Sequence, residues 1–314
     1  MTLFDPVPYT ATDLPALLAL VGECNAATDF CVNVLPGDIR HYMSNRLRGA
    51  DPSSHYWLCH SDTPGKLRAA IVLYDAGDPA IDVLVHPDQA ISQTELDALY
   101  TFAEDRMVAL IRDTGGKVDD IGCEVLECDL TRSALLVRLG YKVGDLFMIY
   151  TRQPLTDAIP PSLLPDGFTI RSVAGEHEAD ALGTLDARAF GRTWDAGQYL
   201  RVMRSPAFSI PHELVVVAPD GRLVAFCVIW IDPVSKSGLF EPVGCDPDFQ
   251  RRGLTRALLY EGMRRMKAEG AHTALVRQDP PQDNPTAAAF YIAIGFVHVT
   301  HAIDHRKAIS PMQR

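Results

Sequence analysis

The sequence predicts an α/β protein of two tandem domains, each a twisted mixed β-sheet flanked by helices. The chain of 314 residues is about twice as long as a typical domain of ~150 residues. Segments with strand and helix patterns alternate along it, which favours an α/β architecture. A proline that follows an extended run and a later glycine that precedes an aromatic residue also occur in the same order in both halves. The content of 47% hydrophobic and 22% charged residues is that of an ordinary globular protein with a sizeable core.

A proline-rich segment divides the chain. Residues 154–165 hold four prolines, which break a helix, and they follow a β-rich run at 147–151. We therefore expect domains at 1–155 and 156–314. From Pro87 to Gly140 is 53 positions, and from Pro247 to Gly295 is 48. Each proline follows an extended run and each glycine precedes an aromatic residue, so the halves are expected to be copies of one unit.

Periodicity and turn residues place the elements of both halves. The pair Asp220-Gly221 is typical of a tight hairpin, and apolar positions 259, 263 and 266 with glycine at 262 recur at helical spacing. The second half is predicted to contain helices over 176–189 and 194–203, strands over 213–217, 223–231 and 238–245, a helix over 254–268, a strand over 273–277, a helix over 286–294 and a strand over 296–303. The first half repeats this loosely, with helices over 13–24 and 37–46, a hairpin over 56–74, an extended run over 81–88 and a helix over 95–112.

Charge and cysteine content exclude several classes of protein. The net charge is −11, with 22 acidic and 12 basic side chains in residues 1–155 against 18 and 17 in residues 156–314. An acidic chain is a poor nucleic-acid binder. The sequence has no apolar run of 18 residues and no basic-then-apolar leader, so neither a membrane span nor a signal peptide is predicted. Seven cysteines without a Cys-x-x-Cys pair favour free thiols in a reducing cytoplasm over a disulfide framework or zinc site.

A candidate anion site lies where a predicted strand passes through a polar loop into the helix at 254–268. The first N–H groups of such a helix carry partial positive charge, and Gly253 removes a side chain where a ligand would approach. Arg251, Arg252 and Arg256 add mobile positive charge there. They belong to a local basic cluster that could meet an anion and that also contains Arg264, Arg265 and Lys267. The pattern indicates a cradle for a phosphate or pyrophosphate. An ordinary strand-to-helix turn with solvated arginines is the alternative.

Two motifs in this half resemble one known family. The run Gln250-Arg-Arg-Gly253-Leu-Thr255 is similar to motif A of the GNAT superfamily of acetyl-coenzyme-A-dependent N-acyltransferases, Gln/Arg-x-x-Gly-x-Gly/Ala, with Thr255 as a departure. The run Asn284 to Phe296 resembles its motif B, Asn-x-x-Ala-x-x-x-Tyr-x-x-x-Gly-Phe. The resemblance is clear over residues 166–306 and extends only in outline over 1–155.

The resemblance implies a role for each matching residue. A bulge is expected in the strand ending at Cys245, with the backbone of Val243 and Cys245 bonding the pantetheine arm of acetyl-CoA. The loop and first turn of the helix would hold the pyrophosphate, and Asn284 would contact the coenzyme arm. The cofactor-binding set is Val243, Cys245, Gln250, Arg251, Arg252, Gly253, Leu254, Thr255, Arg256 and Asn284. No metal is implied.

Acyl transfer to an amine requires a base for the ammonium and an acid for the departing thiolate. Tyr291 matches the family's acid position, although it also fits a packed core tyrosine. Glu241 is the candidate base, and strand alternation predicts that it shares one face with Val243 and Cys245. A structural carboxylate is its alternative role, and Asp232 and the loop 190–199 are rival sources of a base. Cys245 is expected to be a strand residue, since no Gly-x-Ser-x-Gly elbow indicates a nucleophile.

The remaining features lead to the predicted function. His298, His301 and His305 do not share one strand face, so a metal site is not predicted there. The first-half loop at 86–96 lacks glycine and arginine, which predicts a degenerate domain without coenzyme binding. We expect an acetyl-CoA-dependent N-acetyltransferase acting directly on a primary amine of a small molecule, as a monomer or homodimer. The alternatives are a protein N-acetyltransferase and a non-catalytic acyl-CoA-binding or sensing protein.

Overall fold

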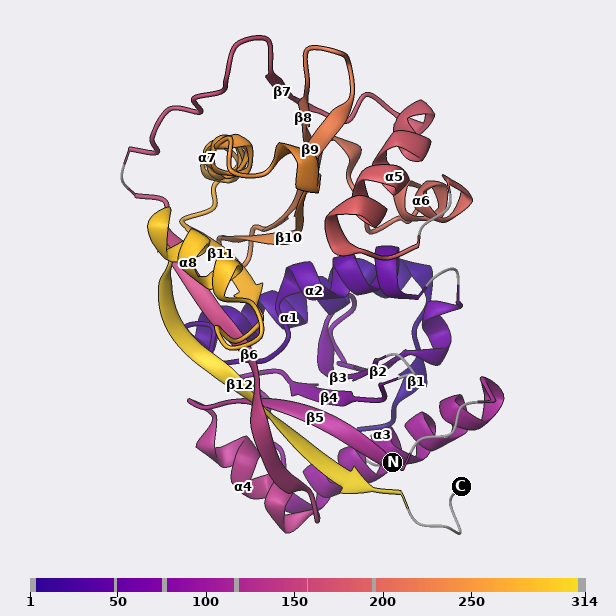
Figure 1. Ribbon diagram of the computed structural model, residues 1–314. Coiled ribbons are helices and arrows are strands. Elements are labelled where there is room, and N and C mark those ends of the chain that lie inside the picture. The colour runs from indigo at the N-terminus through magenta and orange to yellow at the C-terminus, as the bar shows by residue number, and fades with distance from the viewer. Residues whose placement is uncertain are drawn as a thin grey trace.

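The computed structural model describes residues 4–47, 50–74, 78–115, 119–156, 158–193 and 196–309. It confirms the mixed α/β class, with two sheets covered by helices (Figure 1). A four-stranded sheet has the order β1-β2-β3-β4, and an eight-stranded sheet has the order β5-β12-β6-β11-β10-β9-β8-β7. Within these described residues, no helix is both long and apolar enough to cross a membrane.

The first half supplies one sheet and the start of the other. Its strands are β1 (Val7–Pro8), β2 (Tyr56–His60), β3 (Leu67–Leu73), β4 (Ile81–Val85), β5 (Asp120–Leu126) and β6 (Lys142–Pro154). Its α-helices are α1 (Leu14–Thr28), α2 (Pro36–His41), α3 (Gln93–Asp113) and α4 (Leu130–Arg138). A π-helical turn, Tyr42–Arg46, continues α2. The expected helices and hairpin are therefore present, while β1, β5 and α4 were not predicted.

The second half matches its predicted elements closely. Its strands are β7 (Thr169–Ser172), β8 (Glu213–Val217), β9 (Leu223–Asp232), β10 (Ser237–Cys245), β11 (Thr273–Gln278) and β12 (Val297–Ala308). Its α-helices are α5 (Ala179–Phe190), α6 (Ala196–Met203), α7 (Leu254–Ala268) and α8 (Pro285–Ala293). The predicted helix over 194–203 begins in residues outside the described ranges. The strand β7 was not predicted, and β12 is longer than expected.

The two halves exchange strands. The first-half strand β6 pairs with β11, while the last strand, β12, lies between β5 and β6. Figure 1 shows β6 and β12 running side by side from the region of α8 to the region of α4. Both strands are long, at 13 and 12 residues, so each reaches elements of both halves. As a result, one continuous sheet joins the halves.

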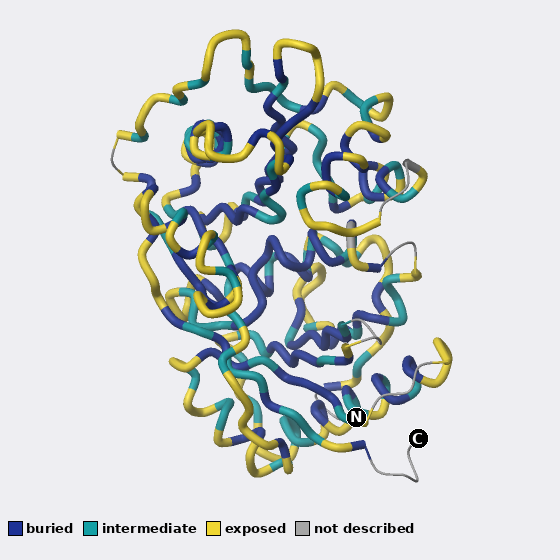
Figure 2. The backbone as a smooth tube through the Cα atoms, viewed as in Figure 1, coloured by how far each residue is buried: buried dark blue, intermediate teal, exposed yellow. Residues whose placement is uncertain are grey.

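An apolar cluster lies where the halves meet. It combines residues of the α1–α2 loop, β5, β6, β9, β10, β11 and β12, namely Leu35, Leu126, Tyr150, Val228, Trp230, Leu239, Leu275 and Ala302. All are buried, and Figure 2 shows that buried segments continue through the middle of the molecule. Burial of apolar side chains from both halves stabilises their relative position.

Gly37 lets α2 approach the sheet closely. A Cβ atom at this position would lie 2.7 Å from Leu239 Cδ2 and 2.9 Å from Trp230 Cβ. The absence of a side chain therefore allows the backbone of α2 to rest directly on β9 and β10. This contact places Asp38 and His41, the polar residues of α2, over the same strands.

The expectation that all cysteines are free thiols is wrong for one pair. Cys31 and Cys128 form a disulfide, with their Cα atoms 6.1 Å apart and 97 positions between them in sequence. The other five cysteines are free. The two cysteines meet because the loop after α1 packs against the turn after β5. The spacing of cysteines along the sequence does not predict such a tertiary contact.

Candidate active site

The strands β10 and β11 pair at one end and then separate. Their parallel ladder covers only Ser237–Leu239 against Thr273–Leu275, although both strands continue beyond it. On its other side, β10 changes register against β9 between Phe240 and Val243, which is the bulge implied by the family resemblance. The peptide bond between Glu241 and Pro242 within it is cis. The bulge lies where the ladder to β11 ends, so a gap opens between the two strands.

The backbone of Val243 and Cys245 borders this gap. Asp246 N donates to Val224 O on β9, at 2.9 Å. Two residues earlier, on β10, Gly244 is paired with Phe226 of β9. Backbone groups alternate in direction along an antiparallel strand. The N–H and C=O groups of Val243 and Cys245 therefore point away from β9, towards β11. This direction matches the one expected for groups that bind a pantetheine arm.

The loop before α7 has the backbone of an open anion cradle. Gly253 is the N-cap residue of α7 with φ 79°, and Arg251 also has a positive φ of 62°. A Cβ on Gly253 would meet no protein atom within 4 Å, so glycine is required by the backbone conformation rather than by crowding. Leu254, Thr255 and Arg256 form the first turn of α7, where N–H groups lack helical partners. Leu254 is buried, which leaves only its backbone to contribute.

Three arginines surround this helix start, and all three are exposed together with Gln250. Arg252 donates to Asp248 O at 3.1 Å, and its guanidinium lies 4.9 Å from the ring centre of Phe249. Arg251 and Arg256 extend the positive charge around the same loop. Positive side chains beside free helix N–H groups are the arrangement that anions prefer.

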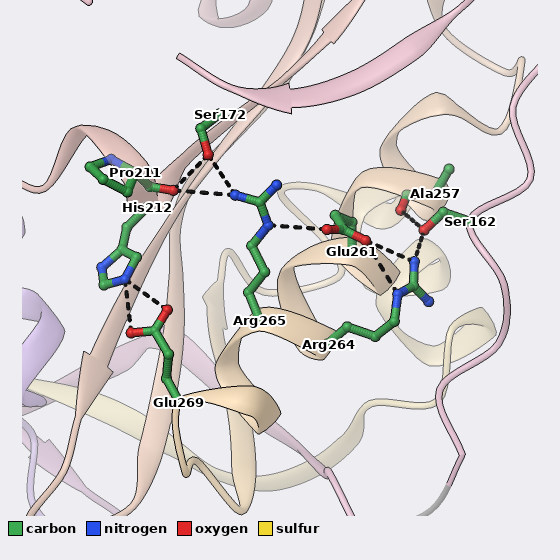
Figure 3. Close-up of polar contacts among 9 residues, drawn as sticks. All are labelled: Ser162, Ser172, Pro211, His212, Ala257, Glu261, Arg264, Arg265 and Glu269. Carbon is green, nitrogen blue, oxygen red and sulfur yellow. Dashed lines mark hydrogen bonds and ion pairs between the residues drawn. The ribbon is translucent and has the colours of Figure 1, made fainter. Parts of the chain in front are cut away.

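The other basic residues of the predicted cluster do not join this cradle. Figure 3 shows Arg264 pointing to Ser162 and Arg265 pointing to Ser172, with Arg265 donating to Ser172 Oγ at 2.5 Å. Arg264 also donates to Pro160 O at 2.7 Å. Lys267 donates to Thr156 O at 3.1 Å. The proline-rich segment thus lies along α7, and these three cationic side chains hold this segment and β7 against α7. The six residues of the basic cluster are therefore divided between the two ends of α7, a helix of 15 residues.

Tyr291 lies on α8, on the α7 side of the sheet. It is 8% exposed and packs against Phe290 and Phe296, with ring centres 5.3 Å and 5.7 Å away. Burial raises the pKa of its phenol, and the charge of Glu241 raises it further. The hydroxyl therefore keeps its proton at neutral pH, which a general acid requires. The packed-core role and the acid role are compatible in this position.

Asn284 begins α8 as its N-cap. Its Oδ1 accepts a hydrogen bond from Ala287 N at 3.1 Å. A side chain occupied in this way stabilises the helix start. Its amide Nδ2 lies 3.5 Å from Asp279 Oδ2, so contact with a coenzyme arm is left to its backbone or to this amide.

Glu241 lies on the opposite face from the side chains of Val243 and Cys245, so the predicted shared face is wrong. Val243 and Cys245 pack into the core below α7, whereas Glu241 Oε1 lies 3.7 Å from His41 Nε2 on α2. The bulge inserts one extra residue between Phe240 and Val243, which reverses the alternation. Glu241 therefore lies on the α2 side of the sheet, and Tyr291 lies on the α7 side, in the core cluster against which Val243 and Cys245 pack.

Sequence reasoning missed three residues with ionisable side chains at this site. Arg277 on β11 lies 3.1 Å from Asp38 Oδ1 and 3.8 Å from Glu241 Oε2. Asp38 and His41 come from the first half. Burial lowers the pKa of His41 to about 4, so its imidazole is neutral at pH 7. An arginine on the inward-facing register of an otherwise apolar strand was the one available signal.

Asp232 and Tyr199 represent the rival sources of a base, and residues 194 and 195 of the loop 190–199 lie outside the described residues. Asp232 caps the turn after β9, where its Oδ2 accepts from Ser235 N at 2.7 Å, at the far end of β10 from Cys245. Tyr199 donates to buried Glu213. Burial raises the pKa of the Cys245 thiol, which disfavours a nucleophilic thiolate. His305 is bonded to Ser133 Oγ at 3.0 Å, while His301 lies 3.3 Å from Glu127, so these histidines have separate surroundings.

The first half contains a counterpart gap without a cradle. A cavity of about 720 Å³ lies beside β4, with Val83, Val85 and Arg132 among its lining residues. At the start of α3, however, Ser92 Oγ caps Glu95 N at 3.3 Å, and the Glu95 carboxylate accepts from Ser92 N at 2.9 Å. This capping box places a negative charge at the position that corresponds to the anion cradle of the second half.

Comparison with known proteins agrees with this geometry. Residues 179–296 match the acetyltransferase (GNAT) family. The mycothiol acetyltransferase of Thermobispora bispora is 25% identical over 98% of this chain and 100% of its own length. That of Paenarthrobacter aurescens is 26% identical over 91% of this chain and 88% of its own.

Two solved structures show the same fold over nearly the whole chain. A GCN5-related N-acetyltransferase from Sphaerobacter thermophilus superposes with a TM-score of 0.64 at 19% identity, covering 99% of this chain and 97% of that one. A tandem GNAT protein from the clavulanic acid biosynthesis pathway superposes with a TM-score of 0.64 at 16% identity, covering 98% and 99%. The chain therefore shares the fold of these tandem structures, and its residues 179–296 match the acetyltransferase (GNAT) family.

Proposed function

We propose that the protein transfers an acetyl group from acetyl-CoA directly to a primary amine of a small molecule. The observation that carries this proposal is the separation of β10 and β11 beyond Leu239, with Glu241 on the α2 side of the sheet and Tyr291 on the α7 side. The cradle before α7 lies at the end of the same strand. Relatives named mycothiol acetyltransferase align over nearly the whole chain, which supports an acceptor related to mycothiol.

In this proposal the gap holds the thioester end of acetyl-CoA. The backbone of Val243 and Cys245 binds the pantetheine arm, and the α7 N-terminus with Arg251, Arg252 and Arg256 binds the diphosphate. Binding from the α7 side leaves the α2 side of the thioester for the acceptor. Acceptor and coenzyme then meet in the gap, with reacting atoms held together rather than encountered by collision.

Two proton transfers accompany the reaction. Glu241 accepts a proton from the acceptor ammonium, directly or through water, and the resulting amine attacks the thioester carbonyl carbon. The tetrahedral intermediate collapses by breaking the carbon–sulfur bond. Tyr291 gives its proton to the departing thiolate, and it regains one from the proton that the attacking nitrogen loses as the amide forms, passed on through solvent. The ammonium-derived proton on Glu241 returns to solvent. The products are an N-acetylated amine and coenzyme A, and no step requires a metal or a covalent enzyme intermediate.

The organisation of the chain follows from the same proposal. Residues 156–314 act as the catalytic domain, and residues 1–155 form a degenerate GNAT-like domain that walls the acceptor side. The capping box on α3 supports the loss of diphosphate binding in the first half. Acetyl-CoA supply favours the cytoplasm as the site of action. Neither nucleic acid nor a membrane is a partner in this scheme.

The test is release of thiol from acetyl-CoA in the presence of a panel of amines, including mycothiol precursors that carry a free amine. One acceptor with saturable turnover supports the proposal. Acetyl-CoA binding without turnover for every amine supports the acyl-CoA-binding alternative instead. Acetylation of peptides in preference to small amines would indicate a protein N-acetyltransferase.

A further inference from the structure

We propose that the disulfide between Cys31 and Cys128 exchanges with small-molecule thiols, and that its opening weakens turnover of the acceptor. The bond ties the loop 29–35, which leads into α2, to the turn after β5. The inference rests on the proposed function, because it makes acceptor turnover depend on the state of this bond. It concerns the regulation of the same site.

The disulfide lies where a dissolved thiol can reach it. Cys128 is exposed and Cys31 is half-buried. Of the five free cysteines, four are buried and Cys245 is half-buried. Exposed disulfides are typically the labile, regulatory ones. In the reducing cytoplasm that the proposed function favours, disulfides are usually transient or redox-sensing.

The exchange consists of two displacements at sulfur. A thiolate attacks Sγ of Cys128, the Sγ–Sγ bond breaks, and Cys31 leaves as a thiolate. A second thiolate attacks the newly added sulfur, so that Cys128 also leaves as a thiolate. The two cysteine thiolates take up the protons that the two added thiols lost. The cysteine pair is thereby reduced, and the two added thiols are oxidised to one disulfide.

Cys128 belongs to a well-fixed part of the first half. Glu127, the residue before it, donates from its backbone N to His301 O on β12 at 2.9 Å. Asp129, the residue after it, is the N-cap of α4, and its Oδ1 accepts from a backbone N–H of that helix at 3.0 Å. Strand pairing and helix capping therefore fix both neighbours, so we expect the loop 29–35 to be the side that moves.

The loop 29–35 has a strained backbone at its start. Asp29 and Phe30 have φ values of 48° and 65°, in the left-handed region that residues other than glycine rarely adopt. Asp29 Oδ1 also lies 3.0 Å from Arg152 Nη1, but the Asp29 side chain is 76% exposed. Exposed ion pairs contribute little to stability. Backbone strain persists only where surrounding contacts hold it, so opening of the disulfide favours a relaxed loop.

One path from this loop to the site runs through Tyr150. Asn33, two residues after Cys31, is buried, and the Tyr150 hydroxyl donates to it, with Asn33 O and Oδ1 both 2.8 Å away. The same hydroxyl accepts from Arg277 Nη1 at 3.2 Å. Arg277 Nη2 in turn lies 3.8 Å from Glu241 Oε2. Movement of Asn33 therefore removes a contact that fixes Tyr150 and, through it, Arg277.

A second path runs through the start of α2. Leu35, the last residue of the loop, is the N-cap residue of α2 and is buried in the apolar cluster between the halves. Its N donates to Asp38 Oδ2 at 2.7 Å. Farther along α2, His41 Nε2 lies 3.7 Å from Glu241 Oε1. A displaced loop therefore displaces the α2 side of the site, whereas the cradle before α7 lies on the opposite face of the sheet.

The experiment compares the oxidised wild type, the wild type reduced with dithiothreitol, and Cys31→Ser/Cys128→Ser. Dithiothreitol is removed by anaerobic gel filtration, and the acetylated amine is measured by mass spectrometry, because residual thiol interferes with detection of released coenzyme A. With the best amine of the panel, kcat/KM should fall by about 3-fold or more in the reduced protein and in the variant, since the competent position of α2 is then only partly populated. The affinity for acetyl-CoA should stay unchanged.

Two controls separate this effect from other actions of the reductant. Dithiothreitol should not change kcat/KM of Cys31→Ser/Cys128→Ser, which has no disulfide to open. Cys59→Ala removes a buried free thiol of the first half and keeps the disulfide, so it should respond to dithiothreitol as the wild type does. Equal kcat/KM in the oxidised and reduced wild type would overturn the inference.

Two further measurements need no acceptor. Alkylation followed by peptide mass spectrometry should find Cys31 and Cys128 as thiols after dithiothreitol treatment of the folded protein, and as a disulfide before it. Amide hydrogen exchange should then rise across residues 29–41 and stay unchanged in α7 and in β2 to β4.

These measurements also distinguish the inference from the proposed function. A disulfide that stays closed in the folded protein contradicts the inference, and so does hydrogen exchange that rises evenly over the first half, which indicates a purely structural crosslink. If no form acetylates any amine, the proposed function fails, whereas an opened disulfide with exchange confined to residues 29–41 still supports thiol exchange and release of the loop. If Cys31→Ser/Cys128→Ser does not fold, the reduced wild type decides.

Discussion

Glu241 Oε1 on β10 lies 3.7 Å from His41 Nε2 on α2, so the candidate base of the second half faces a residue of the first. Trp230 contacts both residues. Its Nε1 donates to the backbone carbonyl of Glu241, and its ring centre lies 6.3 Å from that of the His41 ring. The first half thereby lies against the strand that carries Glu241.

Tyr291→Phe tests the acid role. We expect kcat to fall by about 10²–10⁴-fold, which is the usual contribution of general acid–base catalysis, while acetyl-CoA binds as in the wild type. The phenyl ring preserves the contacts with Phe290 and Phe296, so the fold should persist. Steady-state kinetics and calorimetric binding provide the two measurements. Tyr260→Phe, in half-buried surroundings on α7, is the matched control, and full activity of Tyr291→Phe would remove it as the acid.

Arg252→Glu tests the cradle. The substitution removes a positive charge beside the α7 N-terminus and adds a negative one, so acetyl-CoA binding should weaken by about 1–3 kcal/mol, as for a lost charge-assisted contact. Arg112→Glu makes the same charge change on α3 of the first half and should leave the affinity unaltered. Calorimetry at fixed salt measures both. Equal affinities of the two variants would show that the diphosphate binds elsewhere.

Local patterns in the sequence predicted the elements of the site well. The helix predicted over 254–268 is α7 with the same bounds, and the predicted loop glycine, Gly253, is its N-cap residue. Motif B likewise begins at the N-cap Asn284 and contains Tyr291 on α8. These features depend on residues close together in sequence, where capping and periodicity act directly.

The contacts of Arg277 with Asp38 and Glu241 could not be predicted from local patterns, because tertiary contacts bring these residues together. Arg277 meets Asp38 only because β6 inserts beside β11 and Gly37 allows α2 to lie on the sheet. The face of Glu241 was predicted wrongly for a related reason. One inserted residue at the bulge reverses the alternation, and the position of an inserted residue depends on the partner strand.

Gly37→Ala tests the packing of α2 against the sheet. A Cβ at 2.7 Å from Leu239 and 2.9 Å from Trp230 forces the helix outward, so we expect a loss of about 1–3 kcal/mol in the free energy of unfolding. Denaturant unfolding measures this loss. The displacement also moves Asp38 and His41, so kcat/KM for the acceptor should fall while acetyl-CoA affinity is retained. A fully stable and active variant would show that α2 does not rest on the sheet as described.

The pH dependence of stability can be tested at Glu213, which is fully buried on β8 and accepts a hydrogen bond from Tyr199. Burial raises the pKa of Glu213 to about 8 from an ordinary value of 4.5. The folded protein therefore binds a proton that the unfolded chain releases between pH 4.5 and 8. Across this window the Glu213 contribution to the free energy of unfolding is full at low pH and is lost as the pH rises. Glu213→Gln should flatten the decline in denaturant midpoint over this range.

Glu178→Gln is the matched control for this prediction, because its shift has the opposite sign. The side-chain hydrogen bond from Arg171 lowers the pKa of Glu178, so its contribution is present above the ordinary value of 4.5 and is lost as the pH falls through the lower folded value. Glu178→Gln should therefore change the stability profile only at its acidic end. If Glu213→Gln and the wild type decline in parallel from pH 5 to 8, then Glu213 is ionised in the folded protein and its surroundings are more polar than the contact with Tyr199 indicates.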